Sequence, residues 1–378
     1  MLIYLFISIV LALLFSRKFG IGLSLLLAST FLGVSTFGLS ETLFRSYFHP
    51  QTFEVIALLI FTYLLAQAMD QFGFLERISD SFNSSFGSLS IALIPLILGL
   101  IPMPAGALVS ATMLLPMLKR YKISPERLTV INYWFRHVWT TVWPLYPSVI
   151  IALAVLGKDY AHYALIVFPI SLFSFLAGFM LLTGLETSFK PQNLKVGIKP
   201  LDLIFSLLVI YIIIGRLIIA VLISITALLI DKRPGQSDLK ELLPKALDPK
   251  LIILVFAVMG YKNIVEDCDL AKEFSEEFAD LPIQLLIFFL AFFIGFSTGI
   301  ELSYSSIALP VFLNAVEDPV NLLLLILGGF IGVILSPFHL CFVLTVEFFK
   351  ANMYKCYLII LKPVIVLILL TVILLLLQ

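Results

Sequence analysis

The stretch 91–119, IALIPLILGLIPMPAGALVSATMLLPMLK, decides how this chain is organised. It is almost wholly apolar, yet a Pro-Met-Pro-Ala-Gly run interrupts it in the middle. Pro102 and Pro104 lack the N–H group that an ideal helix needs, and Gly106 lets the backbone turn back. The stretch is therefore either one kinked membrane span or a re-entrant hairpin whose tip lies near the midplane.

The composition is that of a membrane protein. Of the 378 residues, 61% are hydrophobic and 13% are charged, whereas soluble domains carry roughly 25% charged residues. Long apolar runs recur along the chain, so we predict an all-α polytopic membrane protein in the lipid bilayer and exclude the soluble enzyme classes. Lys plus Arg and Asp plus Glu both number 24. No basic excess therefore points to nucleic acid as a partner.

The two halves of the chain show similar features in the same order. Pro116 and Pro310 each close a comparable apolar stretch, and Pro144 and Pro337 each interrupt the span that follows. This ordered series predicts an internal duplication. The expected repeats are 1–190 and 200–378, and their expected re-entrant hairpins are about 88–118 and about 282–314.

Each half also opens on two short apolar helices that break at a basic residue. The first pair is expected at 2–16 and 20–38, with the break at Arg17. The second pair is expected at 201–215 and 217–230, with the break at Arg216.

The distribution of Lys and Arg favours two re-entrant hairpins over two additional crossings. If both stretches crossed the membrane, the loops between them would change sides and the charge bias would be lost. With hairpins, each half has five crossings and the second half is inverted. We therefore expect about ten transmembrane helices in a cell inner membrane, with both termini outside. In this topology, only four loop cations lie outside: Arg45, Lys158, Arg216 and Lys272.

The span after each hairpin carries its own break, at 143–147 in the first half and at 336–337 in the second. Non-helical backbone at membrane depth persists only where protein or water satisfies its polar groups. Half-helix N-termini near the midplane attract carboxylate or phosphate. The simpler interpretation is that the prolines only kink membrane helices. The four half-helices are expected to begin near Gly106, Ser148, Thr298 and His339.

Candidate substrate-binding residues lie at or near these tips and breaks. Arg136 and His137 are included because an intramembrane cation is usually functional or paired, with a snorkelling pair in an aromatic belt as the alternative. Thr140 and Thr141 lie one turn closer to the break. The full set is Pro104, Gly106, Arg136, His137, Thr140, Thr141, Ser148, Ser297, Thr298, Gly299, Ser336 and His339.

Glu301 follows the Ser-Thr-Gly tip of the second hairpin, where the chain is expected to lie deepest. A carboxylate at that depth is either paired with a cation or protonated. With Ser303 it is predicted to carry the coupling ion or proton, and Ser297, Thr298 and Glu301 are the candidate Na⁺ ligands. The alternative is an acid that stabilises the first turn of the outgoing helix. No other metal and no cofactor is expected.

The stretch 100–112, LIPMPAGALVSAT, and the hydropathy plan around it resemble an integral membrane family of unknown function, the one numbered 401 among such domains. The architecture is also similar to the ion transporter superfamily, which includes divalent-anion/sodium symporters and gluconate and citrate permeases. That resemblance implies inverted repeats, two re-entrant hairpins and broken helices, often in dimeric elevators, which makes a homodimer a candidate assembly. The Ser-Asn-Thr signature of its sodium-binding members is replaced here by Pro-Met-Pro-Ala-Gly and Ser-Thr-Gly-Ile-Glu.

The sequence thus predicts a secondary active transporter for a small organic anion. Transport would be coupled to H⁺ or Na⁺ and would proceed by alternating access. An ion channel or passive facilitator with the same hairpins is the alternative. An enzyme is not expected, because no His-Glu-x-x-His or paired Asp motif falls in a span.

Overall fold

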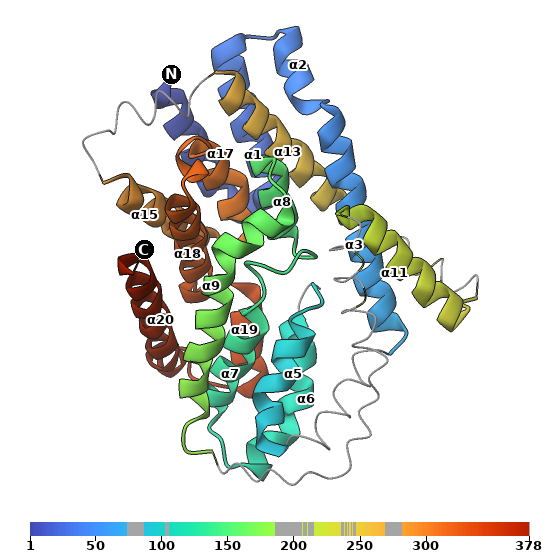
Figure 1. Cartoon of the computed structure of the whole chain (residues 1–378), viewed down its shortest axis with the longest axis vertical. Coiled ribbons are helices and arrows are strands. Elements are labelled where there is room, and N and C mark those ends of the chain that lie inside the picture. The colour runs from blue at the N-terminus through green and yellow to red at the C-terminus, as the bar shows by residue number, and fades with distance from the viewer. Residues whose placement is uncertain are drawn as a thin grey trace. The chain divides into compact units, whose positions relative to one another are not determined.

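The computed structural model describes residues 1–73, 87–102, 106–185, 215–235, 247–268 and 282–377, together with isolated positions between 206 and 244. Every regular element in this part of the chain is a helix (Figure 1). In chain order these are α1 (Leu2–Phe37), α2 (Glu41–Tyr47), α3 (Pro50–Gln71), η1 (Gly87–Leu89), α5 (Ser90–Leu98), α6 (Gly106–Arg120), α7 (Pro125–His137), α8 (Pro147–Leu156), α9 (Tyr160–Gly178), η2 (Phe179–Leu182), α11 (Leu217–Lys232), α13 (Pro249–Asp267), α15 (Ile283–Thr298), α16 (Glu301–Ser303), η3 (Tyr304–Ala308), α17 (Leu309–Val311), η4 (Ala315–Glu317), α18 (Pro319–Leu335), α19 (Leu340–Phe349) and α20 (Met353–Leu376).

Within the described ranges, four helical stretches are long and apolar enough to cross a membrane. These stretches support a membrane protein and agree with the all-helical prediction. The count of ten spans and the two re-entrant hairpins stay predictions. The four stretches are Glu41–Gln71, Tyr160–Leu182, Pro319–Phe349 and Met353–Leu376.

The first helix breaks close to its predicted position. Gly20, with φ 78° and ψ 161°, leaves the helical region in the middle of α1. The sequence prediction placed this break at Arg17, but glycine adopts a positive φ without the steric cost that a side chain imposes. Most of the predicted helix 201–215 lies outside the described residues. Its expected partner is present, since Arg216 is extended and α11 begins at the next residue.

The chain forms two compact units, and each unit takes segments from both halves of the sequence. The first broken span is divided between them, because α7 belongs to the second unit and α8 to the first. The second broken span is divided likewise, with α18 in the first unit and α19 in the second. The first unit is Met1–Leu59, Thr140–Ile170 and Asp248–His339, and the second is Ile60–Trp139, Ser171–Leu247 and Leu340–Gln378.

In the first unit, α15 and α18 pack side by side (Figure 1). Gly328 and Gly332, one turn apart on α18, make this close approach possible. A Cβ atom at Gly328 would overlap the carbonyl oxygen of Phe288, and one at Gly332 would overlap that of Phe292. Small residues at this spacing let helix backbones meet within a membrane. The second predicted hairpin is therefore fixed to the helix that follows it.

In the second unit, α5 packs against both α6 and α7. The helix α19 contacts α6 and α7, and α20 packs along α7. The first predicted hairpin is thus held by the helix that follows it in sequence and by a half-helix from the second half of the chain.

Replacing Gly332 by alanine tests the contact between α15 and α18. An added methyl group in a helix interior normally favours the helix by about 1 kcal/mol, but here it would meet backbone rather than a flexible side chain. We expect G332A to lower the free energy of unfolding by about 1–3 kcal/mol, the usual cost of overpacking. The measurement is thermal unfolding in detergent, with the exposed Ala161→Val on α9 as the control for added volume. An unchanged or raised midpoint for G332A would contradict the packing.

Candidate functional site

The tip of the second predicted hairpin lies in the first unit, where α15 ends as the Ser-Thr-Gly sequence predicts. Gly299 has a left-handed φ of 65°, and its N–H donates to the Gly295 carbonyl at 2.8 Å. Ile300 is extended, and α16 begins at Glu301. A Cβ atom on Gly299 would approach the backbone nitrogen of His339 to 2.7 Å. The position therefore needs glycine both for its backbone angles and for the space around it.

Hydroxyl groups close this tip. The hydroxyls of Thr298 and Ser303 are 2.6 Å apart and share a hydrogen bond. Ser303 Oγ also lies 2.6 Å from the Ile300 carbonyl, and Thr298 Oγ1 lies 2.8 Å from that of Ile294. Ser297 is half-buried beside them. Two of the predicted ion ligands, Thr298 and Ser303, thus lie together and hold the turn.

The break in the second broken span is bonded directly to the tip. Ser336 is extended at the end of α18 and donates its hydroxyl to the Phe296 carbonyl at 2.6 Å. His339 Nδ1 lies 2.7 Å from the Gly299 carbonyl. A carbonyl can only accept, so this bond requires a proton on Nδ1. Two interruptions that the sequence predicted separately therefore form one hydrogen-bonded region of the first unit.

Glu301 is the half-buried first residue of α16. Its carboxylate acts electrostatically on His339 and on the buried Tyr304. Tyr304 opens η3, a π-helical turn, and such turns occur frequently at functional sites. The acid that the sequence singled out thus acts electrostatically on an imidazole that is bonded to the Gly299 carbonyl.

The second part of the first broken span also belongs to the first unit. Ser148, in the first turn of α8, donates to the Thr140 carbonyl at 3.2 Å, and Tyr163 donates to the Thr141 carbonyl at 2.8 Å. Thr140 and Thr141 are both buried, and α8 packs against α16 and η3. The structure therefore brings Thr140, Thr141 and Ser148 into the unit that contains the second hairpin tip. Tyr163 was not among the predicted residues.

In the second unit, α7 holds the break between α5 and α6. Arg136 is 3% exposed, and its guanidinium donates to the carbonyls of Leu98 at 3.1 Å and Ile101 at 3.5 Å. Trp139 Nε1 donates to the Leu96 carbonyl at 3.0 Å. These carbonyls form the negative end of α5, which a cation stabilises. The snorkelling alternative for Arg136 does not describe this buried side chain.

Asn132 binds the other side of the same break and was missed by the sequence analysis. Its amide nitrogen donates to the Ala107 carbonyl at 2.9 Å and to Thr345 Oγ1 at 3.4 Å. Its Oδ1 is buried and has no hydrogen-bond partner among the described residues. The sequence feature that could have identified Asn132 is an amide side chain within a largely apolar predicted span. Gly106 begins α6 at this break, whereas Pro104 lies outside the described residues.

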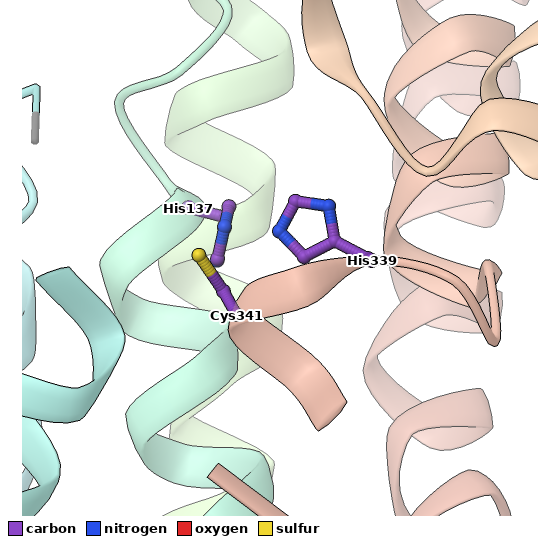
Figure 2. A group of neighbouring side chains, drawn as sticks. All are labelled: His137, His339 and Cys341. Atoms are coloured by element: carbon purple, nitrogen blue, oxygen red, sulfur yellow. The ribbon is translucent and has the colours of Figure 1, made fainter. Parts of the chain in front are cut away.

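His137 and Cys341 approach each other within the second unit, from the end of α7 and the first turn of α19 (Figure 2). A ring nitrogen of His137 and Sγ of Cys341 lie within 4.8 Å of each other, and His137 Nδ1 lies 2.6 Å from the Tyr133 carbonyl. Figure 2 also draws His339, which belongs to the first unit. An imidazole and a thiol are zinc ligands, but a structural zinc site needs four. Among the described residues of the second unit, two such ligands lie at this place.

The described part of the chain is all-helical, and its four long apolar helices indicate a membrane protein. A family profile described as "Protein of unknown function (DUF401)" matches residues 1–377, and the chain belongs to this family. No curated protein matches the chain.

Replacing Arg136 by glutamine tests its structural role at the end of α5. Loss of the guanidinium leaves the α5 carbonyls unsatisfied, so we expect the free energy of unfolding to fall by about 1–3 kcal/mol. The matched control is Arg45→Gln, which removes an exposed pair with Glu41 and should cost less than about 1 kcal/mol. The measurement is thermal unfolding of both variants in one detergent. Equal midpoints for the two variants would contradict the assigned role of Arg136.

Replacing Ser336 by alanine tests the bond between the hairpin tip and the break. We expect a loss of about 1 kcal/mol and faster amide exchange confined to residues 296–301. The control is Ser224→Ala on α11, a buried serine whose hydroxyl donates to the Ala220 carbonyl of its own helix. Hydrogen exchange read by mass spectrometry checks this outcome. Unchanged exchange at 296–301 in S336A would refute the coupling.

Proposed function

We propose that this chain is a secondary active transporter that moves a small organic anion across a cell inner membrane. The observation that carries the proposal is the direct bonding of a hairpin tip to the break in the next span, by Ser336 to Phe296 and by His339 to Gly299. Interrupted helices that meet in this way are the usual setting of substrate and ion sites in secondary transporters. The proposed mechanism is alternating access.

The composition of the two units supports an inverted duplication with repeats 1–190 and 200–378. In the first unit, the helices after Pro282 pack against α18 and against α8 from the other repeat. In the second unit, α5 and α6 pack against α7 and against α19 from the other repeat. Each predicted hairpin thus packs against the helix that follows it and against a half-helix from the other repeat. On this basis we propose five crossings and one re-entrant hairpin per repeat, with both termini outside.

We propose that helix N-termini bind the negative charge of the substrate. The first turn of α8 has no side-chain cap at Tyr146. Pro147 has no N–H and Val149 N–H donates to the Tyr146 carbonyl, so the N–H of Ser148 is the donor proposed for an anionic oxygen. Within the first unit the hydroxyls of Ser148 and Ser297 are further candidates. Within the second unit the N-terminus of α6 at Gly106 is a separate candidate surface. Because the guanidinium of Arg136 is bonded to α5 carbonyls, we assign it to the support of the site. The bonds of Asn132 to Ala107 and Thr345 serve the same purpose.

Glu301 is the proposed coupling group. It begins α16 directly after the hairpin tip and acts electrostatically on His339, so a proton or Na⁺ at the carboxylate would change the charge that His339 experiences. Since His339 is bonded to Gly299, that change reaches the tip itself. The oxygen atoms of Ser297, Thr298 and Ser303 are the further candidates for Na⁺. A relation to the ion transporter superfamily and a homodimeric assembly belong to the same proposal.

Transport in proteoliposomes with Glu301→Gln tests the proposal. Wild-type protein is expected to accumulate a carboxylate against its gradient when an H⁺ or Na⁺ gradient is imposed, with saturation at high substrate. E301Q is expected to lose accumulation at least tenfold while it still exchanges substrate downhill, because the coupling charge is gone. The matched control is Glu317→Gln, an exposed acid in η4, which should retain accumulation.

The outcomes of this experiment are distinct. Full accumulation by E301Q would leave Glu301 as a helix-stabilising acid and remove the coupling assignment. Wild-type flux that needs no gradient and does not saturate would establish the channel or passive facilitator instead. No gradient-driven uptake from a broad panel of carboxylates would refute the organic anion as substrate.

A further inference from the structure

A pocket with two cations lies at one end of the second unit, away from the helix breaks. It has a volume of about 340 Å³ and is lined by Arg127, Met180, Leu181, Thr183, Ile359 and Lys362. The lining side chains come from the start of α7, from η2 and the residue after it, and from α20, and these helices pack together. None of these residues takes part in the proposed transport site.

Arg127 is fixed at this pocket by the backbone of η2 and the residue that follows. Its Nε donates to the Leu181 carbonyl at 2.7 Å and its Nη2 to the Thr183 carbonyl at 2.5 Å. A guanidinium has five N–H donors, so these bonds set its orientation without using all of its donors. Arg127 is half-buried and forms no ion pair with an acidic side chain in the described part of the chain.

Lys362 is unusual because of where its charge lies. It is the tenth residue of α20, a 24-residue helix that is among the most apolar of the chain. A charge at that place in a membrane span is costly unless it has a partner or reaches the interface. A lysine side chain leans toward the helix N-terminus, and here that direction leads to the pocket that also contains Arg127. Its side chain is exposed, and it has no acidic partner among the described residues.

The remaining walls of the pocket are apolar. Met180, Leu181 and Ile359 line it, and exposed apolar residues continue along α20, among them Leu358, Leu361, Ile365 and Leu369. Two cations beside an apolar surface match a ligand that carries a phosphate at one end and a hydrocarbon chain at the other. A free phosphate ion would use the cations but would leave the apolar walls without a function.

We propose that this pocket binds the head group of an anionic phospholipid. The phosphate accepts hydrogen bonds from Arg127 and Lys362, and an acyl chain lies along the apolar face of α20. Basic pockets between transmembrane helices on the cytoplasmic side bind such head groups in other membrane proteins. The topology proposed above puts the start of α7 and the start of α20 on that side. The lipid joins α7, η2 and α20 at one edge of the second unit.

Lipid titration of purified protein tests the assignment. Wild-type protein in neutral detergent is mixed with phosphatidylglycerol or with phosphatidylcholine, and bound lipid is counted by native mass spectrometry. We expect preferential retention of phosphatidylglycerol, and an affinity about fivefold lower in Lys362→Gln, the factor for one cation at an anionic lipid surface. Lys362→Arg keeps the charge and should restore binding.

The matched control is Lys355→Gln, an exposed lysine two turns earlier on α20 that does not line the pocket. Equal losses in K355Q and K362Q, or no loss in K362Q, would overturn the proposal by showing general surface attraction. Stabilisation by inorganic phosphate alone that depends on Lys362 would reassign the pocket to a free anion. Size-exclusion profiles that match the wild type establish that each variant is folded.

Discussion

Where a membrane helix breaks, backbone N–H and C=O groups lose their hydrogen-bond partners within the helix. They must find other partners, because hydrocarbon offers none. The bonds that meet this requirement organise both units. In the first, the end of α15 is satisfied by Ser336 and His339 from the break after α18. In the second, the end of α5 is satisfied by Arg136 and Trp139 at the end of α7. In each case the helix that follows a predicted hairpin supplies the groups that hold its interruption.

Because side-chain bonds hold both helix breaks, the breaks can rearrange more easily than an intact helix can. A break held by a few side-chain bonds costs less to rearrange than the continuous backbone ladder of an intact helix. The bonds made by Ser336 and His339 connect the break after α18 to the last turn of α15 and to Gly299, the residue that follows it. Glu301 acts electrostatically on His339, one of the two residues that make this connection. The tight glycine packing of α15 on α18 keeps the helices themselves fixed.

The sequence predicted the all-helical class and most of the breaks because prolines, glycines and apolar runs act locally. The ends of α15 at Thr298 and of α18 at Leu335 fall where the Ser-Thr-Gly and Ser-Pro sequences place them. The sequence did not predict which residues distant along the chain contact one another. Nothing local reveals that Arg136 binds α5 carbonyls, that Asn132 reaches Ala107, or that His137 lies near Cys341. The site residues are therefore predicted as a set, and their individual roles depend on contacts that only the structure supplies.

The central claim is that the chain between α13 and α18 enters the membrane and returns to the same side. Single cysteines at Gln284 and Glu317, both exposed, flank this segment in a chain whose native cysteines are replaced by serine. Labelling of intact cells with a membrane-impermeant thiol reagent reports which side each position occupies. The account predicts that both cysteines react from outside. Reaction of one from outside and of the other only after the membrane is opened would show a full crossing and contradict it.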